Sequence, residues 1–135
     1  MAWIEPKTDW TPQYRGDYED FNRISGNINY LKEMADELFH RLSEISLNDE
    51  RTKLSYIYAR EMNDIEDALE SLNIETYGLE IGEKQTYKAN GSTPLWSEFN
   101  RIESACLLLF EMFQAHKDLL PRLSFVLGGQ KGIKV

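Results

Sequence analysis

Apolar side chains recur at alternating steps of three and four residues along three long stretches of this chain. The stretches run over residues 21–45, 54–72 and 95–120, and this period is typical of helices that bury one face. A chain of 135 residues can bury one modest core, so the three stretches belong to a single domain. We therefore expect an all-α fold, specifically an antiparallel three-helix bundle.

The expected bundle covers residues 17–120, with helices at about 17–46, 49–73 and 94–120. Asp17 is placed to cap the first helix and Asn48 or Asp49 the second, while Ser92 or Thr93 precedes Pro94 at the start of the third. Only the short sequence Leu-Asn-Asp at 47–49 separates the first two helices. A connection this short predicts antiparallel neighbours.

Three segments lack the helical period. Residues 1–16 contain two tryptophans and two prolines, and we expect an extended N-terminal arm. Residues 74–93 contain three glycines and form a long loop, for which a β-hairpin turning at Asn90 and Gly91 is one alternative. Pro121 is expected to stop the third helix, which leaves residues 121–135 as a short C-terminal tail.

A short phrase recurs near the start of each stretch. It reads Phe-Asn-Arg-Ile at 21–24, Met-Asn-Asp-Ile at 62–65 and Phe-Asn-Arg-Ile at 99–102, each with a leucine seven residues after the isoleucine. The apolar pair of each copy is expected in the core. Shared bundle patterning is sufficient to explain the middle copy, whereas the identical first and third copies indicate a specific role.

Asparagine is mildly unfavourable inside a helix, so Asn22 and Asn100 are candidates for structural polar contacts. Their side-chain amides would bond across helices or to the terminal arm. Arg23 and Arg101 are the matching candidates, each positioned to clamp a carboxylate; the nearby carboxylates are Glu19, Asp20, Glu98 and Glu103. These roles are structural, and the same pattern leaves open whether the asparagines bond within one chain or between two.

Only half of a metal-binding motif is present. Glu37 and His40 form an E-x-x-H, which di-iron carboxylate bundles carry twice, but the other histidine, His116, has Phe113 three residues before it. We expect Glu37 and His40 on a solvated face, with no metal ion or other cofactor. The sequence also lacks a G-x-S-x-G, a P-loop and a dinucleotide fingerprint, so we expect no catalytic residues and no enzyme.

The charge of the chain restricts its partners. A net charge of −8 repels phosphate backbones, so nucleic acid is not expected, and there is no basic amphipathic face for a membrane. No apolar segment approaches the roughly 18 residues that span a bilayer, and the N-terminus has no signal-peptide pattern. The single cysteine, Cys106, lies in an apolar run. We expect it buried, in a protein made in a reducing cytoplasm.

Two segments resemble a known group of proteins. Residues 6–31, with Lys-Thr-Asp-Trp at 7–10 followed by Asn-Arg-Ile at 22–24, are similar to the openings of structural proteins in bacteriophage and prophage tail modules and phage-tail-like particles. The ending "RLSFVLGGQKGIKV" at 122–135 resembles endings in the same group. Many of those proteins continue into long fibre or receptor-binding regions, and this chain stops at Val135, so the resemblance implies assembly rather than receptor recognition.

From this resemblance we expect a non-enzymatic structural protein of a phage tail or baseplate that acts by protein–protein contacts. It would be a homo-oligomer or bind neighbouring tail proteins, and it would end in a virion or phage-tail-like particle. Trp3, Ile4 and Trp10 are the candidate partner-docking residues, because they are too apolar to be left in solvent. The alternatives are a small acidic adaptor or regulatory module that binds a host protein, and a metal-dependent helical-bundle enzyme.

Overall fold

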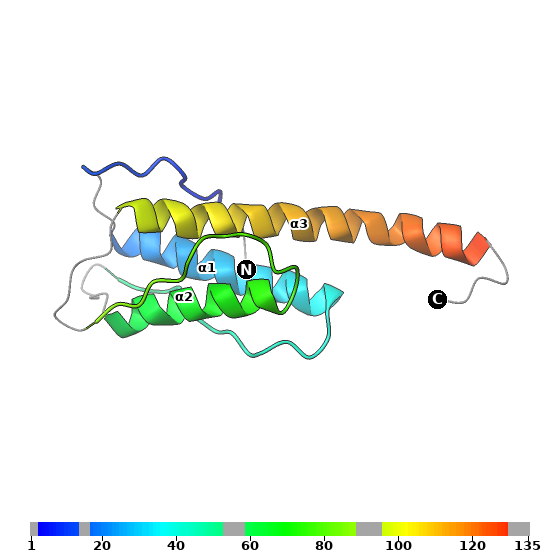
Figure 1. Ribbon diagram of the computed structural model, residues 1–135, viewed down its shortest axis with the longest axis horizontal. Helices are drawn as coiled ribbons and strands as arrows, with labels where there is room; N and C mark the ends of the chain where they lie inside the picture. The colour runs from blue at the N-terminus through cyan, green and yellow to red at the C-terminus, as the bar shows by residue number, and fades with distance from the viewer. Residues whose placement is uncertain (1–2, 14–16, 53–58, 89–95, 130–135) are drawn as a thin grey trace.

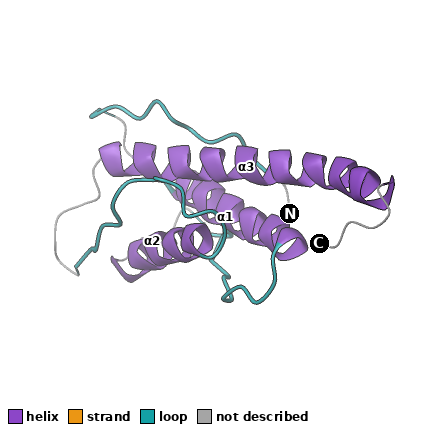
Figure 2. Ribbon diagram, turned by 45° about the vertical axis from the view of Figure 1, so that its right-hand side comes forward, coloured by secondary structure: helices purple, strands orange, loops and turns teal. Residues whose placement is uncertain are grey.

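The computed structural model of the chain describes residues 3–13, 17–52, 59–88 and 96–129, and side chains as far as residue 120. It contains three helices, which are α1 (Tyr18–Leu38), α2 (Ala59–Ile74) and α3 (Trp96–Gly129) (Figures 1 and 2). Within the described ranges no residue belongs to a strand. The predicted all-α three-helix bundle is therefore confirmed. No helix in these ranges is both long and apolar enough to cross a membrane.

The core is built from equivalent positions of the three helices. Each copy of the recurring phrase contributes its isoleucine, and each isoleucine is at most 1% exposed: Ile24, Ile65 and Ile102. The residue before each asparagine is also buried, as is the leucine seven residues after each isoleucine: Phe21, Met62, Phe99, Leu31, Leu72 and Leu109. The phrase thus contributes the same core positions from each helix.

The helices run parallel, so the prediction of an antiparallel bundle is wrong. At the start of α1, Phe21 packs edge-on against Phe99, with ring centroids 5.7 Å apart. At its end, Glu37 lies 3.8 Å from Lys117 of α3. Contacts that advance together along both helices require that α1 and α3 point the same way.

α2 has the same direction as the other two helices. Arg51, which precedes α2, binds Ser25 near the start of α1 and Glu61 near the start of α2. At the other end, Glu75 follows α2 and binds Ser43, which follows α1. The prediction failed because it assumed a short turn between the helices, whereas the connection that begins at Phe39 runs back along α1.

Helices α1 and α2 are therefore shorter than expected. α1 ends at Leu38 and not at 46, because Phe39 is extended and Arg41 has a φ of 61°. Leu42, Ile45 and Leu47 pack against the core from a non-helical segment. Leu42 and Ile45 follow Leu38 at steps of four and three residues, which imitated the continuation of the helix in the sequence. α2 begins at Ala59 and not at 49.

The third helix is longer than expected. It continues through Pro121 to Gly129, since a proline within a helix removes one hydrogen bond and can kink the helix without ending it. Past the level where α1 and α2 end, α3 projects from the bundle (Figure 1). The Asn90–Gly91 turn, the Ser92, Thr93 and Pro94 start signals, and residues 130–135 of the expected tail lie outside the described residues.

Each helix is preceded by a non-helical segment that runs back along the bundle. We call residues 3–13, 39–52 and 75–88 the return segments; they lead to α1, α2 and α3 respectively. The first leads into a capping box at α1, in which Asp17 accepts from the Asp20 amide and Asp20 accepts from the Asp17 amide. The predicted cap at Asp17 is confirmed.

Candidate functional site

The polar groups of this molecule are concentrated where the return segments meet the helices. An asparagine clamp, as we use the term, is an asparagine side chain whose Oδ1 accepts from the backbone N–H of a residue and whose Nδ2 donates to the carbonyl of that same residue. In one such clamp, Asn100 of α3 holds Trp10, with distances of 2.8 Å to the N–H and 3.0 Å to the carbonyl.

Six such clamps are present in the described residues, two on each return segment. The pairs, written helix asparagine first, are Asn27 with Ile4, Asn100 with Trp10, Asn29 with Leu47, Asn22 with Arg51, Asn73 with Leu79, and Asn63 with Tyr87. Every bond among them is between 2.7 and 3.0 Å.

The clamps supply hydrogen-bond partners that the backbone of the return segments needs. An extended segment that lies against a helix has no neighbouring strand, so its N–H and carbonyl groups need partners from side chains. The asparagine amide presents one acceptor and two donors, and it can therefore satisfy both groups of one residue. No buried side-chain nitrogen or oxygen of the described residues lacks a hydrogen-bond partner.

The asparagines of the recurring phrase act in a cyclic order. Asn22 of α1 holds the return segment that leads to α2, and Asn63 of α2 holds the one that leads to α3. Asn100 of α3 holds the one that leads back to α1. The molecule thus has an approximate threefold arrangement within one chain.

A second bond accompanies each of these three clamps. Three residues after the asparagine, a buried side chain accepts from the side chain of the residue that the asparagine holds. The three pairs are Arg51 Nη1 with Ser25 Oγ at 3.0 Å, Tyr87 Oη with Glu66 Oε2 at 2.8 Å, and Trp10 Nε1 with Glu103 Oε2 at 2.5 Å. The backbone and the side chain of the held residue are thus fixed by one helical turn.

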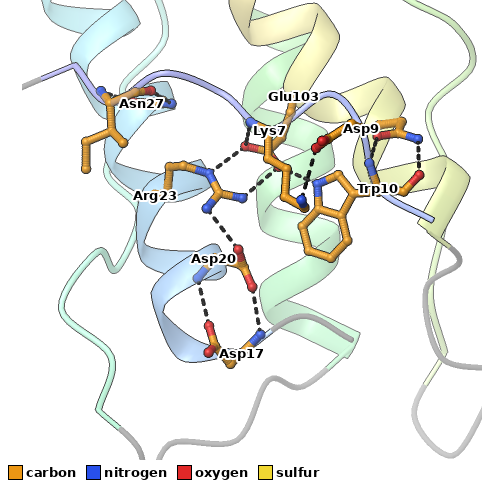
Figure 3. A network of polar contacts seen from close by, with 10 residues as sticks. Lys7, Asp9, Trp10, Asp17, Asp20, Arg23, Asn27 and Glu103 are labelled. Atoms are coloured by element: carbon orange, nitrogen blue, oxygen red, sulfur yellow. Dashed lines mark hydrogen bonds and ion pairs between the residues drawn. The ribbon is translucent and has the colours of Figure 1, made fainter. Parts of the chain in front are cut away.

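Glu103 is the centre of the largest network (Figure 3). It is 1% exposed and forms two bonds with the guanidinium of Arg23, at 2.7 and 2.8 Å. It also accepts from the backbone of Lys7, and Arg23 reaches Asp20 at 2.8 Å. Although burial lowers the pKa of Arg23, the bonds and charges of Glu103 and Asp20 outweigh burial and raise it.

The third helix repeats this bond toward α2. Arg101 pairs with Glu66 and with Glu98. Glu66 also accepts from Tyr87, and burial together with that bond raises the pKa of the Tyr87 phenol. The arginines after Asn22 and Asn100 therefore each bind a buried glutamate of another helix, Arg23 from α1 to α3 and Arg101 from α3 to α2.

The cycle is incomplete at α2. The residue after Asn63 is Asp64, which is exposed, and the acceptor on α1 is Ser25, which carries no charge. Arg51 occupies the space instead, because it donates to Ser25 and pairs with Glu61 at 3.2 Å. At two of the three equivalent positions the arginine comes from a helix, whereas at the third it is Arg51 of a return segment.

The expected docking residues have different environments. Trp10 is 3% exposed and stacks on Phe99, with ring centroids 4.6 Å apart, so it is part of its own core. Trp3 stacks on Phe110 at 4.2 Å. Only the side chain of Ile4 remains open, at 54% exposed. As folded, the arm offers one of its three apolar residues to a partner.

The E-x-x-H residues are separated by the end of α1. Glu37 lies in the helix and His40 beyond it, and both are exposed. Among the described residues no group of three or more His, Cys, Asp or Glu side chains could hold a metal ion. Cys106 is buried and free, and burial raises the pKa of its thiol.

Besides the single side chains of Ile4, Trp96 and Leu108, two places on the described surface expose apolar groups. One is the projecting end of α3, where Leu119 is 47% and Leu120 is 40% exposed. The other is a hollow between α2 and the third return segment. Its lining includes four apolar side chains and charged side chains of both signs: Leu69, Ile74, Leu79, Ile81, Glu66, Glu70, Glu80, Lys84 and Arg101. Ile74 is 66% exposed there.

Sequence reasoning identified part of this arrangement. It selected Asn22, Arg23, Asn100 and Arg101, all of which form hydrogen bonds or ion pairs in the structure. It did not select Asn63, although the middle copy places it at the position of Asn22 and Asn100. It also missed three asparagines outside the phrase and the buried carboxylate on α2: Asn27, Asn29, Asn73 and Glu66.

No protein-family model matches the chain, and no curated protein or solved structure is detectably similar to it.

Proposed function

We propose that this protein is a non-enzymatic structural component of a phage tail, baseplate or phage-tail-like particle, and that it acts by protein–protein contacts. The resemblance of residues 6–31 and 122–135 to tail-module proteins supports the class of particle. The observation that carries the proposal is the projecting end of α3, where Leu119 and Leu120 are exposed. Exposed apolar side chains on a helix without a packing partner are typical of a docking element.

The rest of the bundle is suited to hold that element. The clamps and buried ion pairs fix three parallel helices and three return segments to one another, so α3 is anchored along its first half. A rigid base with one free helix end meets a partner without the ordering cost of a disordered segment. The return-segment arm, with Trp10 buried, belongs to that base in this proposal.

The test begins with purified particles from the source phage or prophage, in which we expect the protein to be found by mass spectrometry. The full-length chain is then assayed by calorimetry against purified products of the adjacent tail genes. Replacing Leu119 and Leu120 by glutamate should weaken binding at least tenfold, since the apolar contact would be lost.

Leu108→Glu is the matched control. Leu108 lies on the same helix and is 39% exposed, but it lies between Phe99 and Lys117, which both contact residues of α1. Absence of the protein from particles, together with no binding to any adjacent tail product, would reject the proposal.

A second candidate function is an acidic adaptor that binds a host protein through α2. It is favoured by the carboxylates Asp64, Asp67 and Glu70 along α2, whose side chains are partly or fully exposed. Glu70→Lys with Glu80→Lys would abolish binding to such a host protein, whereas the Leu119 and Leu120 substitutions would leave it unchanged.

A further inference from the structure

We propose that the place where α1 and α3 hold residues 3–13 is a recognition site for an extended, tryptophan-bearing segment, and that residues 3–13 of a second copy occupy it by exchange. We call its side chains the segment site: Asn27, Tyr30, Phe99, Asn100, Glu103 and Phe110. The inference goes beyond the proposed function and does not depend on it, since it uses no contact of the projecting α3 end.

The segment site binds the backbone of its occupant at two clamps. Asn27 of α1 accepts from the N–H of Ile4 at 3.0 Å and donates to its carbonyl at 2.7 Å. Asn100 of α3 holds Trp10 in the same way, at 2.8 and 3.0 Å. Bonds to the backbone give affinity for an extended segment without regard to its side chains.

Glu103 makes the site selective for tryptophan. It is 1% exposed and accepts from the indole Nε1 of Trp10 at 2.5 Å and from the backbone N–H of Lys7 at 3.0 Å (Figure 3). The indole ring stacks on Phe99, with ring centroids 4.6 Å apart. Tryptophan combines a large apolar ring with a group that only donates, which is what an aromatic ring beside a buried carboxylate requires.

A second ring is recognised seven residues earlier in the segment. Trp3 stacks on Phe110 of α3, with ring centroids 4.2 Å apart and an interplanar angle of 9°. Its ring centroid lies 6.0 Å from that of Tyr30 of α1. Two tryptophans seven positions apart occur only once in the sequence, at Trp3 and Trp10. The occupant that fits the site is therefore residues 3–13, from the same copy or from another.

The order of the clamps leaves the site open to another copy. The phrase asparagines hold residues 39–52 and 75–88 at positions 29 and 24 residues later, because the helix directly before each segment holds it. The clamp of Asn100 on Trp10 joins residues 90 positions apart, across α1 and α2. No direct connection therefore joins residues 3–13 to the α3 that holds them, and every bond is the same when the segment site belongs to a second copy.

Exchange of an identical element is a low-cost route to association, because it keeps the native bonds and needs no new surface. The segment of the same copy competes at an effective concentration on the order of mM if its connection is short. We therefore expect linked copies at high protein concentration, and at lower concentration when a copy has a defective segment of its own.

Two full-length variants test the exchange by complementation. The acceptor variant, Trp10→Ala, has a defective segment and an intact segment site, and the donor variant, Asn100→Ala, has the reverse. Each variant alone gains nothing by exchange and should be monomeric. The mixture brings an intact segment to an intact site, so after refolding together from urea it should contain a 1:1 complex, measured by sedimentation velocity.

The matched control is a chain with both substitutions, Trp10→Ala and Asn100→Ala. It has no intact segment to give, so its mixture with the acceptor variant should remain monomeric. Circular dichroism of each chain before mixing establishes that the helices are formed.

A second measurement uses the original chain and does not require that a variant folds. A synthetic peptide of residues 3–13 is added to the isotope-labelled chain, and the indole N–H signal of Trp10 is followed by NMR. Because the peptide and the tethered segment are identical, half of the segment should be displaced at a peptide concentration on the order of mM. A peptide with Trp10→Ala should need at least tenfold more. A peptide with Asp9→Ala is the control and should act as the original peptide does, since the Asp9 side chain is 84% exposed.

Three results would overturn the inference. A mixture of folded acceptor and donor variants that stays monomeric would show that a second copy does not supply the segment. An unchanged Trp10 signal at peptide concentrations well above the mM range would show that the site does not accept a segment from outside. Equal displacement by all three peptides would show that it does not select tryptophan. If a variant does not fold, the peptide series decides, and none of these results bears on whether the protein is found in particles.

Discussion

An asparagine side chain ends in the same amide group that links the residues of a backbone, and this chain uses that likeness six times. A helix has no free backbone groups along its sides to pair with an extended segment. The asparagine supplies them at single points. Its mildly unfavourable helix propensity, a fraction of a kcal/mol, is smaller than the cost of two unpaired backbone groups, about 1–3 kcal/mol each.

Asn63 is the best residue at which to test the clamps. Shared helix patterning alone could explain an asparagine at this position of the sequence, so a large loss of stability in its variant would show that the clamp itself matters. Asn63→Ala leaves the N–H and carbonyl of Tyr87 without their partner. We expect a loss of about 2–4 kcal/mol in the free energy of unfolding, measured by urea denaturation. Asn48→Ala is the control, since Asn48 is exposed and its side chain bonds only to the nearby Glu50 amide; equal losses in both variants would contradict the clamp.

Tyr87 is also expected to lower the stability of the fold at alkaline pH. Its phenol has a raised pKa in the folded chain because of burial and the bond to Glu66, whereas in the unfolded chain it ionises near pH 10. Above that pH the unfolded state binds fewer protons than the folded state. The contribution of Tyr87 to the free energy of unfolding is therefore fully present below about pH 10. It falls as the pH rises further, by up to about 1.4 kcal/mol per pH unit.

Tyr87→Phe should be less stable at neutral pH, since it lacks the hydrogen bond, and should lose stability less steeply above pH 10. Thermal unfolding of both proteins between about pH 8 and 11 measures the slopes. The other tyrosines and Cys106 are common to both, so parallel curves would show that Tyr87 contributes nothing to the alkaline transition.

At the scale of the elements, the helices were predictable and the return segments were not. The three-four period of apolar residues identified all three helices, because each buries one face along its length. The segment 39–52 was assigned to helix because Leu42 and Ile45 continue that period, but both reach the core from a non-helical backbone. Periodicity reports which side chains are buried and does not report the backbone that carries them.

In the return segments, amide hydrogen exchange should therefore be slow only at isolated residues. The N–H groups of the six held residues should exchange slowly, because each donates to an asparagine of a helix. Neighbouring amides such as those of Glu50 and Gly78, which also donate to an oxygen, should be partly protected. Described amides of these segments that donate to no acceptor should exchange much faster than those of the held residues. Amide exchange measured by NMR checks this, and protection of every second residue would instead indicate a β-ladder.

At the scale of the whole molecule, the relative direction of the helices could not be predicted from the sequence. Parallel helices need long connections. The residues 47–49, which were expected to form a short turn, are part of such a connection, the return segment 39–52. The aligned helix dipoles of a parallel arrangement are unfavourable, so contacts between the helices must offset them. The ion pairs from Arg23 to Glu103 and from Arg101 to Glu66 do so at buried positions. No local pattern in the sequence indicated Glu66 as a partner of Arg101, because the two residues are 35 positions apart and lie on different helices.

A zero-length carbodiimide cross-link tests the parallel direction. Lys117 Nζ lies 3.8 Å from Glu37 Oε2, so peptide mapping should recover an amide bond between them. In an antiparallel bundle Lys117 would lie near the start of α1. Lys117→Arg provides the control, since it keeps the charge but cannot form the cross-link; a product joining Lys117 to Glu19 or Asp20 would contradict the structure.

The cyclic order of the clamps has a consequence for synthesis on the ribosome. Trp10 is held by Asn100, 90 positions later in the chain, and bonds to Glu103 after that. Ile4 can bind Asn27 of α1 early, but Trp10 has no final partner until α3 has emerged from the exit tunnel. Contacts this distant in sequence form late, because much chain entropy is lost before they form. Translation can therefore complete two helices without completing the fold, and a product truncated before α3 would expose Trp10 and become a target for chaperones or proteases.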